Sequence, residues 1–273
     1  MSDLSAAPAT GTERIAAAFR GHGRTAALMP YLMGGFPSLE ESLEIGRLYA
    51  RYADLVEVGV PFSDPLADGP AIQAAGQRAL AAGATLEGVL DELAVPLSRE
   101  VPVVLMCYAN PIFARGLGRL ADALGAGEIA GLIVPDMPAA EAADLRAACD
   151  AHGVALVPLV APTTPTETLR AIASSARGFV YVVSVTGVTG ERTELPPELR
   201  NVVEGVRAAA TVPAAVGFGI GTPAQAAAVG EIADGVIIGS RLVRAVAEAP
   251  SLKQGLAGLD RFLQETAAAL QAR

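Results

Sequence analysis

A single carboxylate within an apolar segment is the residue most suited to chemistry in this sequence. Glu57 lies in the run Leu-Val-Glu-Val-Gly, in the alternation phase of Leu55 and Gly59. If this run is a strand of a closed barrel, one phase faces the interior, where burial raises the pKa of a carboxyl group. Such a group suits proton transfer near neutral pH. The alternative is a structural Glu paired with an arginine, but the adjoining loop favours a catalytic role.

A loop rich in proline follows Glu57 and supplies two further carboxylates. Residues 60–70 read Val-Pro-Phe-Ser-Asp-Pro-Leu-Ala-Asp-Gly-Pro, which is long for a connection between a strand and a helix. Asp64 precedes Pro65 and fits a turn-forming role. Asp68 can also form a turn, but its distance along the chain from Glu57, across a folded loop, makes it the better partner carboxylate. Glu57 and Asp68 are therefore the predicted catalytic residues.

Glycine turns after two predicted strands indicate a phosphate site. One turn follows 214–216 and reads Gly-Phe-Gly-Ile-Gly, and the other follows 235–238 and reads Gly-Ser. Glycines let backbone N–H groups approach an oxyanion, and a helix N-terminus expected after the second turn offers unpaired donors. A tight turn is the alternative explanation for each motif alone. Their placement on consecutive strands favours a substrate phosphate, and the candidate binding segments are Gly217-Phe218-Gly219-Ile220-Gly221 and Gly239-Ser240.

A tyrosine and the long segment that follows it form a third candidate feature. Tyr181 lies in the apolar run 179–183 and is either a core residue or part of a binding pocket. Residues 184–197 are small, polar and rich in glycine, as expected for a lid over a phosphorylated ligand. The segment includes Thr189, Gly190 and Arg192, and Arg192 fits an ordinary surface charge equally well.

The composition narrows the possible chemistry. There are 29 acidic and 20 basic residues, a net charge of −9, which disfavours nucleic acid and anionic membrane as partners. Nineteen of the basic residues are Arg, and the single Lys253 lies near the C-terminus, so a Schiff-base mechanism is not expected. His22 and His152 each precede a glycine at an expected helix end. No pair of His or Cys has metal-ligand spacing, and we expect no metal site.

Apolar runs alternate with alanine-rich helical periodicity along the whole chain, after a short helix at 13–20. The pattern predicts a (β/α)₈ TIM barrel, an α/β fold of one domain with an extra N-terminal helix. An open doubly wound sheet is the alternative. The predicted strands are 27–33, 55–58, 103–108, 131–134, 155–159, 179–183, 214–216 and 235–238. The predicted helices after them are 39–52, 86–95, 117–124, 140–151, 166–176, 198–209, 223–229 and 242–249.

The termini and cysteines suggest where the protein works. We expect residues 1–12 to form a flexible leader and 13–273 to form the catalytic domain. The leader lacks the apolar stretch of a signal peptide, so a cytoplasmic location is expected. Cys107 and Cys149 lie in apolar stretches and are expected to be core residues rather than a disulfide.

These motifs resemble those of the tryptophan synthase α-subunit family. The similarity runs from about Arg14 to beyond Arg241 and is carried by E-V-G-V-P-F-S-D-P-L-A-D-G-P, Y-A-N-P-I-F, I-V-P-D-M-P, S-V-T-G-V-T-G and V-G-F-G-I. The resemblance implies a barrel-shaped lyase that cleaves indole-3-glycerol phosphate to indole and glyceraldehyde 3-phosphate. It implies an α2β2 assembly, in which a β subunit carries pyridoxal phosphate and condenses indole with serine. No cofactor is implied for this chain.

The resemblance also implies roles for individual residues. Glu57 would donate a proton to indole C3 and accept one from the glycerol hydroxyl. Asp68 would accept a hydrogen bond from the indole N–H, and Tyr181 would line the indole pocket. Thr189 would close its loop over Asp68. The phosphate donors implied by the resemblance are Gly190, Gly219, Gly239 and Ser240.

The β subunit is expected to meet the strand ends that carry 36–37, 110–113 and 136–138. Phe36 stands where some members of the family carry an acidic residue, so one partner contact would differ. Two alternatives for the function are another phosphate-binding barrel, such as a sugar-phosphate isomerase, and a non-catalytic regulatory subunit. Met33-Gly34-Gly35-Phe36 lack the carboxylate or cysteine expected of such an isomerase, and intact Glu57 and Asp68 argue against a non-catalytic subunit.

Overall fold

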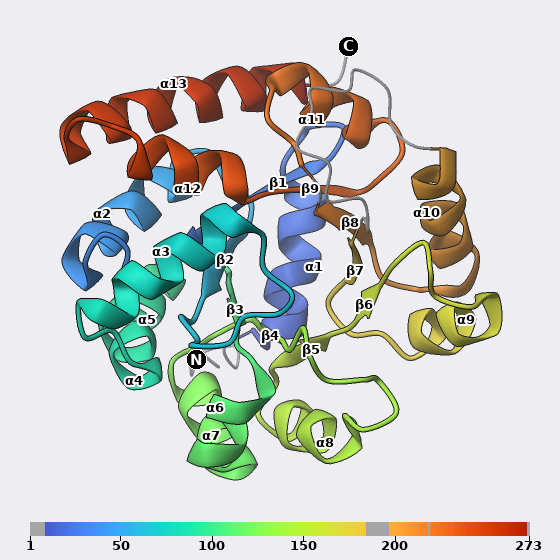
Figure 1. The fold of residues 1–273 in the computed structure, drawn as a ribbon. Coiled ribbons are helices and arrows are strands. Elements are labelled where there is room, and N and C mark those ends of the chain that lie inside the picture. Colours follow the sequence, from blue (N-terminus) through green and yellow to red (C-terminus); the bar gives the residue numbers. More distant parts are fainter. Residues whose placement is uncertain (1–8, 184–196, 218, 272–273) are drawn as a thin grey trace, which may run out of the picture.

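The computed structural model describes residues 9–183, 197–217 and 219–271, which fold into a barrel of parallel strands surrounded by helices (Figure 1). This confirms the predicted (β/α)₈ fold. The strands lie in the order β5-β4-β3-β2-β1-β9-β8-β7-β6. Their bounds are β1 Ala27–Met33, β2 Val56–Gly59, β3 Val103–Met106, β4 Gly131–Ile133, β5 Ala155–Val157, β6 Leu159–Val160, β7 Val180–Val183, β8 Ala214–Gly217 and β9 Gly235–Ile238.

Pro158 explains why nine strands make an eight-stranded barrel. The predicted strand 155–159 is divided at this residue into β5, which pairs with β4, and β6, which pairs with β7. Proline has no N–H and cannot donate to the ladder. Its carbonyl accepts from the N–H of Tyr181 at 2.9 Å. The two short strands are therefore consecutive parts of one barrel strand, and they close the ring.

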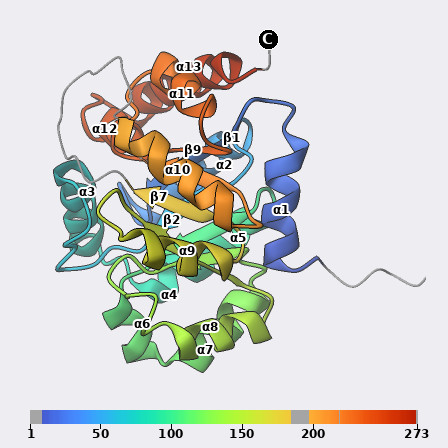
Figure 2. The same cartoon turned by 90° about the vertical axis from the view of Figure 1, so that its right-hand side faces the viewer.

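Helices cover the outside of the barrel between successive strands (Figures 1 and 2). Within the described residues, no helix is sufficiently long and apolar to cross a lipid bilayer. The helix bounds are α1 Gly11–Gly21, α2 Leu39–Ala50, α3 Pro70–Ala81, α4 Leu86–Gly88, α5 Val95–Ser98, α6 Ala109–Arg115, α7 Leu117–Ala126, α8 Ala143–Ala151, α9 Thr166–Ser174, α10 Pro197–Ala209, α11 Pro223–Gly230, α12 Ser240–Ala247 and α13 Leu252–Ala269.

Some helices differ from the sequence-based expectation. The expected helix 86–95 extends to Ser98 as α4, a π-helical turn at Val89–Ala94 and α5. Pro96 lies at the start of α5, where it removes a backbone donor, and such a gap favours a widened turn. α3, α6 and α13 were not predicted. α3 begins at Pro70, where the long loop ends, and its weak amphipathic pattern, with Gly76 inside, hides it in the sequence.

The extra N-terminal helix closes one end of the barrel. Ile15 of α1 is fully buried in the same apolar cluster as Met29, Leu55 and Phe179, which face the barrel interior. The ring of Phe19 lies 5.7 Å from that of Phe179. Both views show α1 lying across this end (Figures 1 and 2). The barrel is therefore plugged at the N-terminal ends of its strands, which leaves the opposite end for a site.

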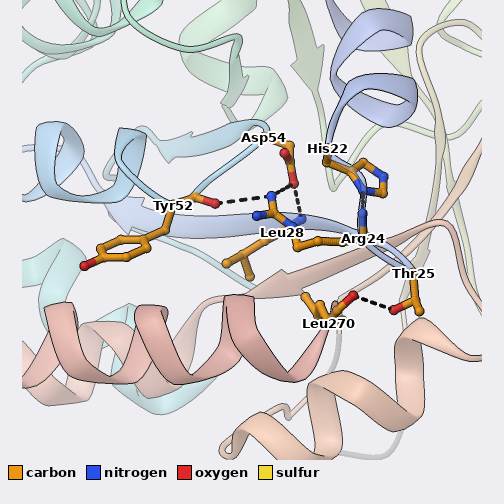
Figure 3. A network of polar contacts seen from close by, with 7 residues as sticks. All are labelled: His22, Arg24, Thr25, Leu28, Tyr52, Asp54 and Leu270. Atoms are coloured by element: carbon orange, nitrogen blue, oxygen red, sulfur yellow. Dashed lines mark hydrogen bonds and ion pairs between the residues drawn. The ribbon is translucent and has the colours of Figure 1, made fainter. Parts of the chain in front are cut away.

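A polar network fastens the chain near this closed end (Figure 3). The Asp54 carboxylate accepts hydrogen bonds from the Leu28 N–H at 2.7 Å and from the Arg24 guanidinium. Arg24 also donates to the Tyr52 carbonyl at 3.3 Å. The Leu270 carbonyl, beyond α13, accepts from the N–H of Thr25 at 2.8 Å. The residues before β1 are thus tied both to the start of β2 and to the end of the chain.

A second aspartate repeats this arrangement on the other side of β1. Asp234 lies just before β9, and its N–H donates to the Ala214 carbonyl of β8 at 2.8 Å. Its carboxylate accepts a hydrogen bond from the Ala214 N–H at 2.9 Å. Arg207 donates to the same carboxylate at 2.6 Å. The same unit thus occurs twice: an aspartate before one strand binds an arginine and an amide at the start of a neighbouring strand.

We expect Asp54→Ala to lower the free energy of unfolding by about 3 kcal/mol, because it strands the Arg24 charge and the Leu28 amide. The Arg24 and Asp54 side chains are only 17% and 12% exposed. Glu100→Ala is the matched control, since it breaks the Arg47–Glu100 pair, whose side chains are 57% and 43% exposed; we expect a loss below about 1 kcal/mol. Urea unfolding checks both. Equal losses in the two variants would contradict the prediction.

Candidate active site

Glu57 lies at the open end of the barrel and faces its interior. In β2 it is in register with Tyr31 of β1 and Val104 of β3, and Val104 belongs to the interior cluster. In-register residues of parallel neighbours point to the same side of the sheet. The side chain is 1% exposed. The predicted orientation of Glu57 is therefore confirmed.

The environment of Glu57 keeps its carboxyl group neutral. Neither carboxyl oxygen has a hydrogen-bond partner among the described residues. Burial raises the pKa of Glu57 to about 8, and the charge of Asp68 adds to this rise. At neutral pH the buried carboxyl group is therefore protonated. It can give that proton to a bound molecule.

Asp68 lies near Glu57 at the end of the loop 60–69. Burial raises the pKa of Asp68 to about 6, and a hydrogen bond from the Tyr108 hydroxyl opposes this rise. Asp68 is thus mainly ionised at neutral pH while Glu57 is mainly protonated. Two nearby carboxyl groups with separated pKa values are the usual sign of a divided acid and anion role. Asp64, the other carboxylate of the loop, is exposed.

Three tyrosines surround the two carboxyl groups. Burial raises the pKa of the Tyr31 and Tyr181 hydroxyls, and the charges of Asp68 and Glu57 raise it further. Tyr108 is affected by Asp68 in the same way. Tyr181 was a sequence candidate, whereas Tyr31 and Tyr108 were not. The available signal was a tyrosine in an apolar strand, whose hydroxyl requires a polar surrounding.

Glycines at two strand ends make room for these hydroxyls. A Cβ atom on Gly59, the last residue of β2, would overlap the Tyr31 hydroxyl oxygen. A Cβ atom on Gly217, the last residue of β8, would overlap that of Tyr181. Each tyrosine therefore leans along its strand toward the open end and covers the end of a neighbouring strand. Packing against the backbone of Gly59 and Gly217 therefore fixes the positions of the two hydroxyls.

The candidate phosphate residues are partly described. Gly239 precedes α12, and Ser240 is its first residue; among the described residues, no side chain caps this helix. The N-terminus of α11, by contrast, is capped by Thr222 and Gln225. Within the described part of the chain, the first amides of α12 therefore have no capping side chain. Gly219 is exposed and has a φ of +32°, a backbone conformation that favours glycine. Thr189, Gly190 and Phe218 lie outside the described residues.

A cavity of about 590 Å³ lies between the residues that follow β4 and those that follow β6, and it is lined by Asp136, Arg146 and Thr168 among others. Neither Glu57 nor Asp68 lines it. Across the described part of the chain, no group of three or more His, Cys, Asp or Glu side chains is arranged to hold a metal ion. Both histidines end helices, as the sequence predicted: His22 follows α1 and His152 follows α8.

Comparison with known proteins gives one consistent family. The family model described as "Tryptophan synthase alpha chain" matches residues 18–271. A tryptophan synthase alpha chain from Prochlorococcus marinus is 48% identical over 85% of this chain and 86% of its own length. The solved tryptophan synthase of Mycobacterium tuberculosis is 35% identical, with a TM-score of 0.87, over 97% of this chain and 100% of that one. An α2β2 tryptophan synthase complex from Pyrococcus furiosus is 32% identical, with a TM-score of 0.84, over 90% and 99%.

The raised pKa of Glu57 predicts a pH-dependent stability. Between its ordinary pKa of 4.5 and the folded value of about 8, the folded state holds one proton more than the unfolded state. Stability therefore falls as pH rises through this window, by about 1.4 kcal/mol per pH unit from this group. Glu57→Gln removes this contribution, so its stability should depend less on pH.

Urea unfolding at about pH 5 and about pH 8 measures the two slopes. Glu100→Gln, at an exposed position, is the control and should keep the native slope. Parallel pH dependence in native protein and Glu57→Gln would show that Glu57 is ionised in the folded state at neutral pH.

Proposed function

Because the chain belongs to the tryptophan synthase alpha chain family, and is therefore a lyase that cleaves indole-3-glycerol phosphate, we propose that Glu57 and Asp68 carry out this cleavage. The membership decides against a sugar-phosphate isomerase. The observation that carries the proposal is the pair of carboxyl groups at the barrel mouth, one with a pKa of about 8 and one of about 6. A retro-aldol reaction without a lysine or metal requires such an acid and such an anion.

Glu57 acts as acid and then as base in this proposal. The protonated carboxyl group gives its proton to indole C3, and the ring nitrogen takes the positive charge. The carboxylate then takes the proton of the glycerol hydroxyl next to the ring. The bond between C3 and that carbon breaks, its electron pair restores the neutral indole, and the oxygen forms the aldehyde. Glu57 ends the cycle protonated, as it began.

Asp68 stabilises the cation in this proposal. Its carboxylate accepts a hydrogen bond from the indole N–H, and its charge favours the intermediate in which that nitrogen is positive. Because burial holds the pKa of Asp68 near 6, the group is ionised at the pH where Glu57 is protonated. Tyr181, 9% exposed beside Glu57, forms part of the wall of the indole pocket.

The phosphate of the substrate binds, we propose, at the start of α12. The backbone N–H groups of Gly239 and Ser240 supply donors, together with the positive end of the helix. Gly239 lies beside the ring of Tyr31, so this position borders the two carboxyl groups. Gly219 adds a donor from the turn after β8, and Phe218, Thr189 and Gly190 complete the site.

A β subunit is the proposed partner, in an α2β2 assembly like that of the Pyrococcus furiosus complex. A form of the Mycobacterium tuberculosis enzyme is aminoacrylate-bound, which supports pyridoxal phosphate on the β subunit; for this chain we propose no cofactor. Leu66 and Phe113 are 83% and 59% exposed on segments of the open end, and such side chains favour an interface.

The expected contact through Phe36 is wrong. Phe36 is 3% exposed and lies under the Arg78 guanidinium, whose central carbon is 4.6 Å from the ring centroid. The turn folds this ring inward, because burial of an aromatic side chain is more favourable than exposure. We therefore restrict the proposed partner surface to 110–113, 136–138 and Leu66.

The cytoplasm is the proposed location. Cys107 and Cys149 are both buried free thiols, which suits a reducing compartment.

Substitution of the two carboxylates tests the proposed chemistry. We expect Glu57→Gln to lower turnover by about 10²–10⁴-fold or more, because one group serves two proton transfers. We expect Asp68→Asn to lower turnover by about 10²–10³-fold with a much smaller change in KM, because its charge acts on the cation. Asp64→Asn, an exposed change in the same loop, should retain activity.

An assay of indole release from indole-3-glycerol phosphate measures each variant. The native pH profile should fall below about pH 6, where Asp68 gains a proton, and above about pH 8, where Glu57 loses one. More than about a tenth of native turnover in Glu57→Gln would exclude it as the proton carrier.

The partner is tested by titration with a β subunit. We expect the β subunit to raise turnover at least tenfold, which requires about 1.4 kcal/mol of preference for the competent arrangement of the loop 60–69. By linkage, glycerol 3-phosphate bound at the active site should raise the affinity for the β subunit. The factor should equal that by which the β subunit raises the affinity for glycerol 3-phosphate. Equal affinities with and without this ligand, together with unchanged turnover, would leave the partner proposal without support.

A further inference from the structure

Tyr108 contacts the loop 60–69 at three places. Its ring stacks on that of Phe62, with centroids 5.1 Å apart and planes 26° apart. Its hydroxyl oxygen accepts a hydrogen bond from the Ala67 N–H at 3.1 Å. The same hydroxyl lies close enough to the Asp68 carboxyl group to lower its pKa as a donor. One side chain therefore holds the beginning and the end of the loop.

Tyr108 is itself held firmly by the barrel. It is 3% exposed and lies between β3 and α6. On one side the Cys107 N–H donates to the Ile133 carbonyl of β4 at 3.0 Å. On the other side the Ala109 N–H donates to the Asp136 carboxylate at 2.8 Å. The ring thus projects from a fixed stretch of backbone, as a positioning residue requires.

The loop has little other attachment to the barrel. The backbone N–H of Asp68 donates to the Pro65 carbonyl at 3.1 Å, within the loop. Gln73, from the helix that follows, donates to the Asp68 carbonyl at 2.8 Å and to the Pro65 carbonyl at 3.3 Å. Within the described residues, the one hydrogen bond that joins 61–68 to a more distant part of the fold ends on Tyr108.

We propose that Tyr108 is a positioning residue for the cleavage, which holds Asp68 over the site by clamping the loop 60–69 from the barrel side. The proposal rests on the proposed function of Asp68. A hydroxyl that accepts from Ala67 has its one proton left for Asp68. Donation of this proton favours the ionised carboxylate.

The electrostatic surroundings agree with this role. Burial and the charge of Asp68 raise the pKa of Tyr108, so the hydroxyl remains protonated and continues to donate. The hydrogen bond from Tyr108 lowers the pKa of Asp68, which burial raises. The other titratable groups that face Asp68 are Glu57, Tyr31 and Tyr181, and Asp136 acts on Tyr108.

Tyr108→Phe tests the proposal, because it keeps the ring beside Phe62 and removes only the hydroxyl. We expect turnover to fall about 10–100-fold, as for a hydrogen bond to a charged group. We expect the acidic limb of the kcat/KM profile to move upward by about one pH unit, because Asp68 loses the group that favours its ionised form. A merely structural hydroxyl would not move this limb.

Tyr52→Phe is the matched control. It removes a hydroxyl that donates to Asp260 at 2.8 Å, between α2 and α13 on the outside of the barrel. We expect its turnover and pH profile to match those of the native chain. A similar upward shift in this variant would mean that loss of any tyrosine–aspartate bond perturbs the profile, and it would overturn the assignment.

The double variant Tyr108→Phe, Asp68→Asn decides whether Tyr108 acts through Asp68. We expect it to be no slower than Asp68→Asn alone, and a further tenfold loss would overturn the proposal. If Asp68→Asn is slow while Tyr108→Phe has native turnover and a native acidic limb, the role of Tyr108 fails and the function of Asp68 stands. If Asp68→Asn retains native turnover, the proposed function of Asp68 itself fails.

Discussion

The desolvation of one carboxyl group is the constraint on which the site depends. Glu57 is 1% exposed, and its oxygens have no hydrogen-bond partner among the described residues. An ionised carboxylate in this position would be costly, so the folded chain keeps the proton. Asp68 is held at the edge of the same space with a lower pKa, because the Tyr108 hydroxyl partly offsets its burial. Glu57 is the acid and Asp68 the anion because their surroundings shift their pKa values differently, not because one is Glu and the other Asp.

The barrel divides stability and chemistry between its two ends. At the closed end, α1 inserts Ile15 into the interior, and aspartates before β2 and β9 bind arginines and strand amides. At the open end, strands finish in glycines, and a carboxyl group lies without a partner. The second arrangement costs stability and the first supplies it. Such a division lets one end hold strained or unsatisfied groups without threatening the fold.

The sequence predicted those features that depend on local pattern. The apolar runs marked the strands, and the alternation phase of Glu57 predicted its inward direction, because both follow from a period of two. The division at Pro158 was missed, because a single proline within an apolar run alters only a hydrogen bond. The sequence analysis also did not predict Tyr31 and Tyr108 as site residues, for another reason. Their places beside the carboxyl groups arise from contacts between distant segments, which no spacing along the chain reveals. Phe36 was wrongly expected at a partner surface, since its burial under Arg78 depends on α3, a helix the pattern did not show.

The closure at the polar network has a consequence for how the chain is made. β1 pairs with β2 on one side and with β9 on the other; its first residue, Ala27, bonds to Asp234, and Thr25 before it bonds to Leu270. During synthesis the first strand leaves the ribosome long before these last residues exist. One edge of β1 therefore has no strand beside it until β9 has been translated, and an unpaired edge invites pairing with other chains. Synthesis that stops before Gly235 leaves this edge of β1 unpaired, whereas β9 covers it once it has been made.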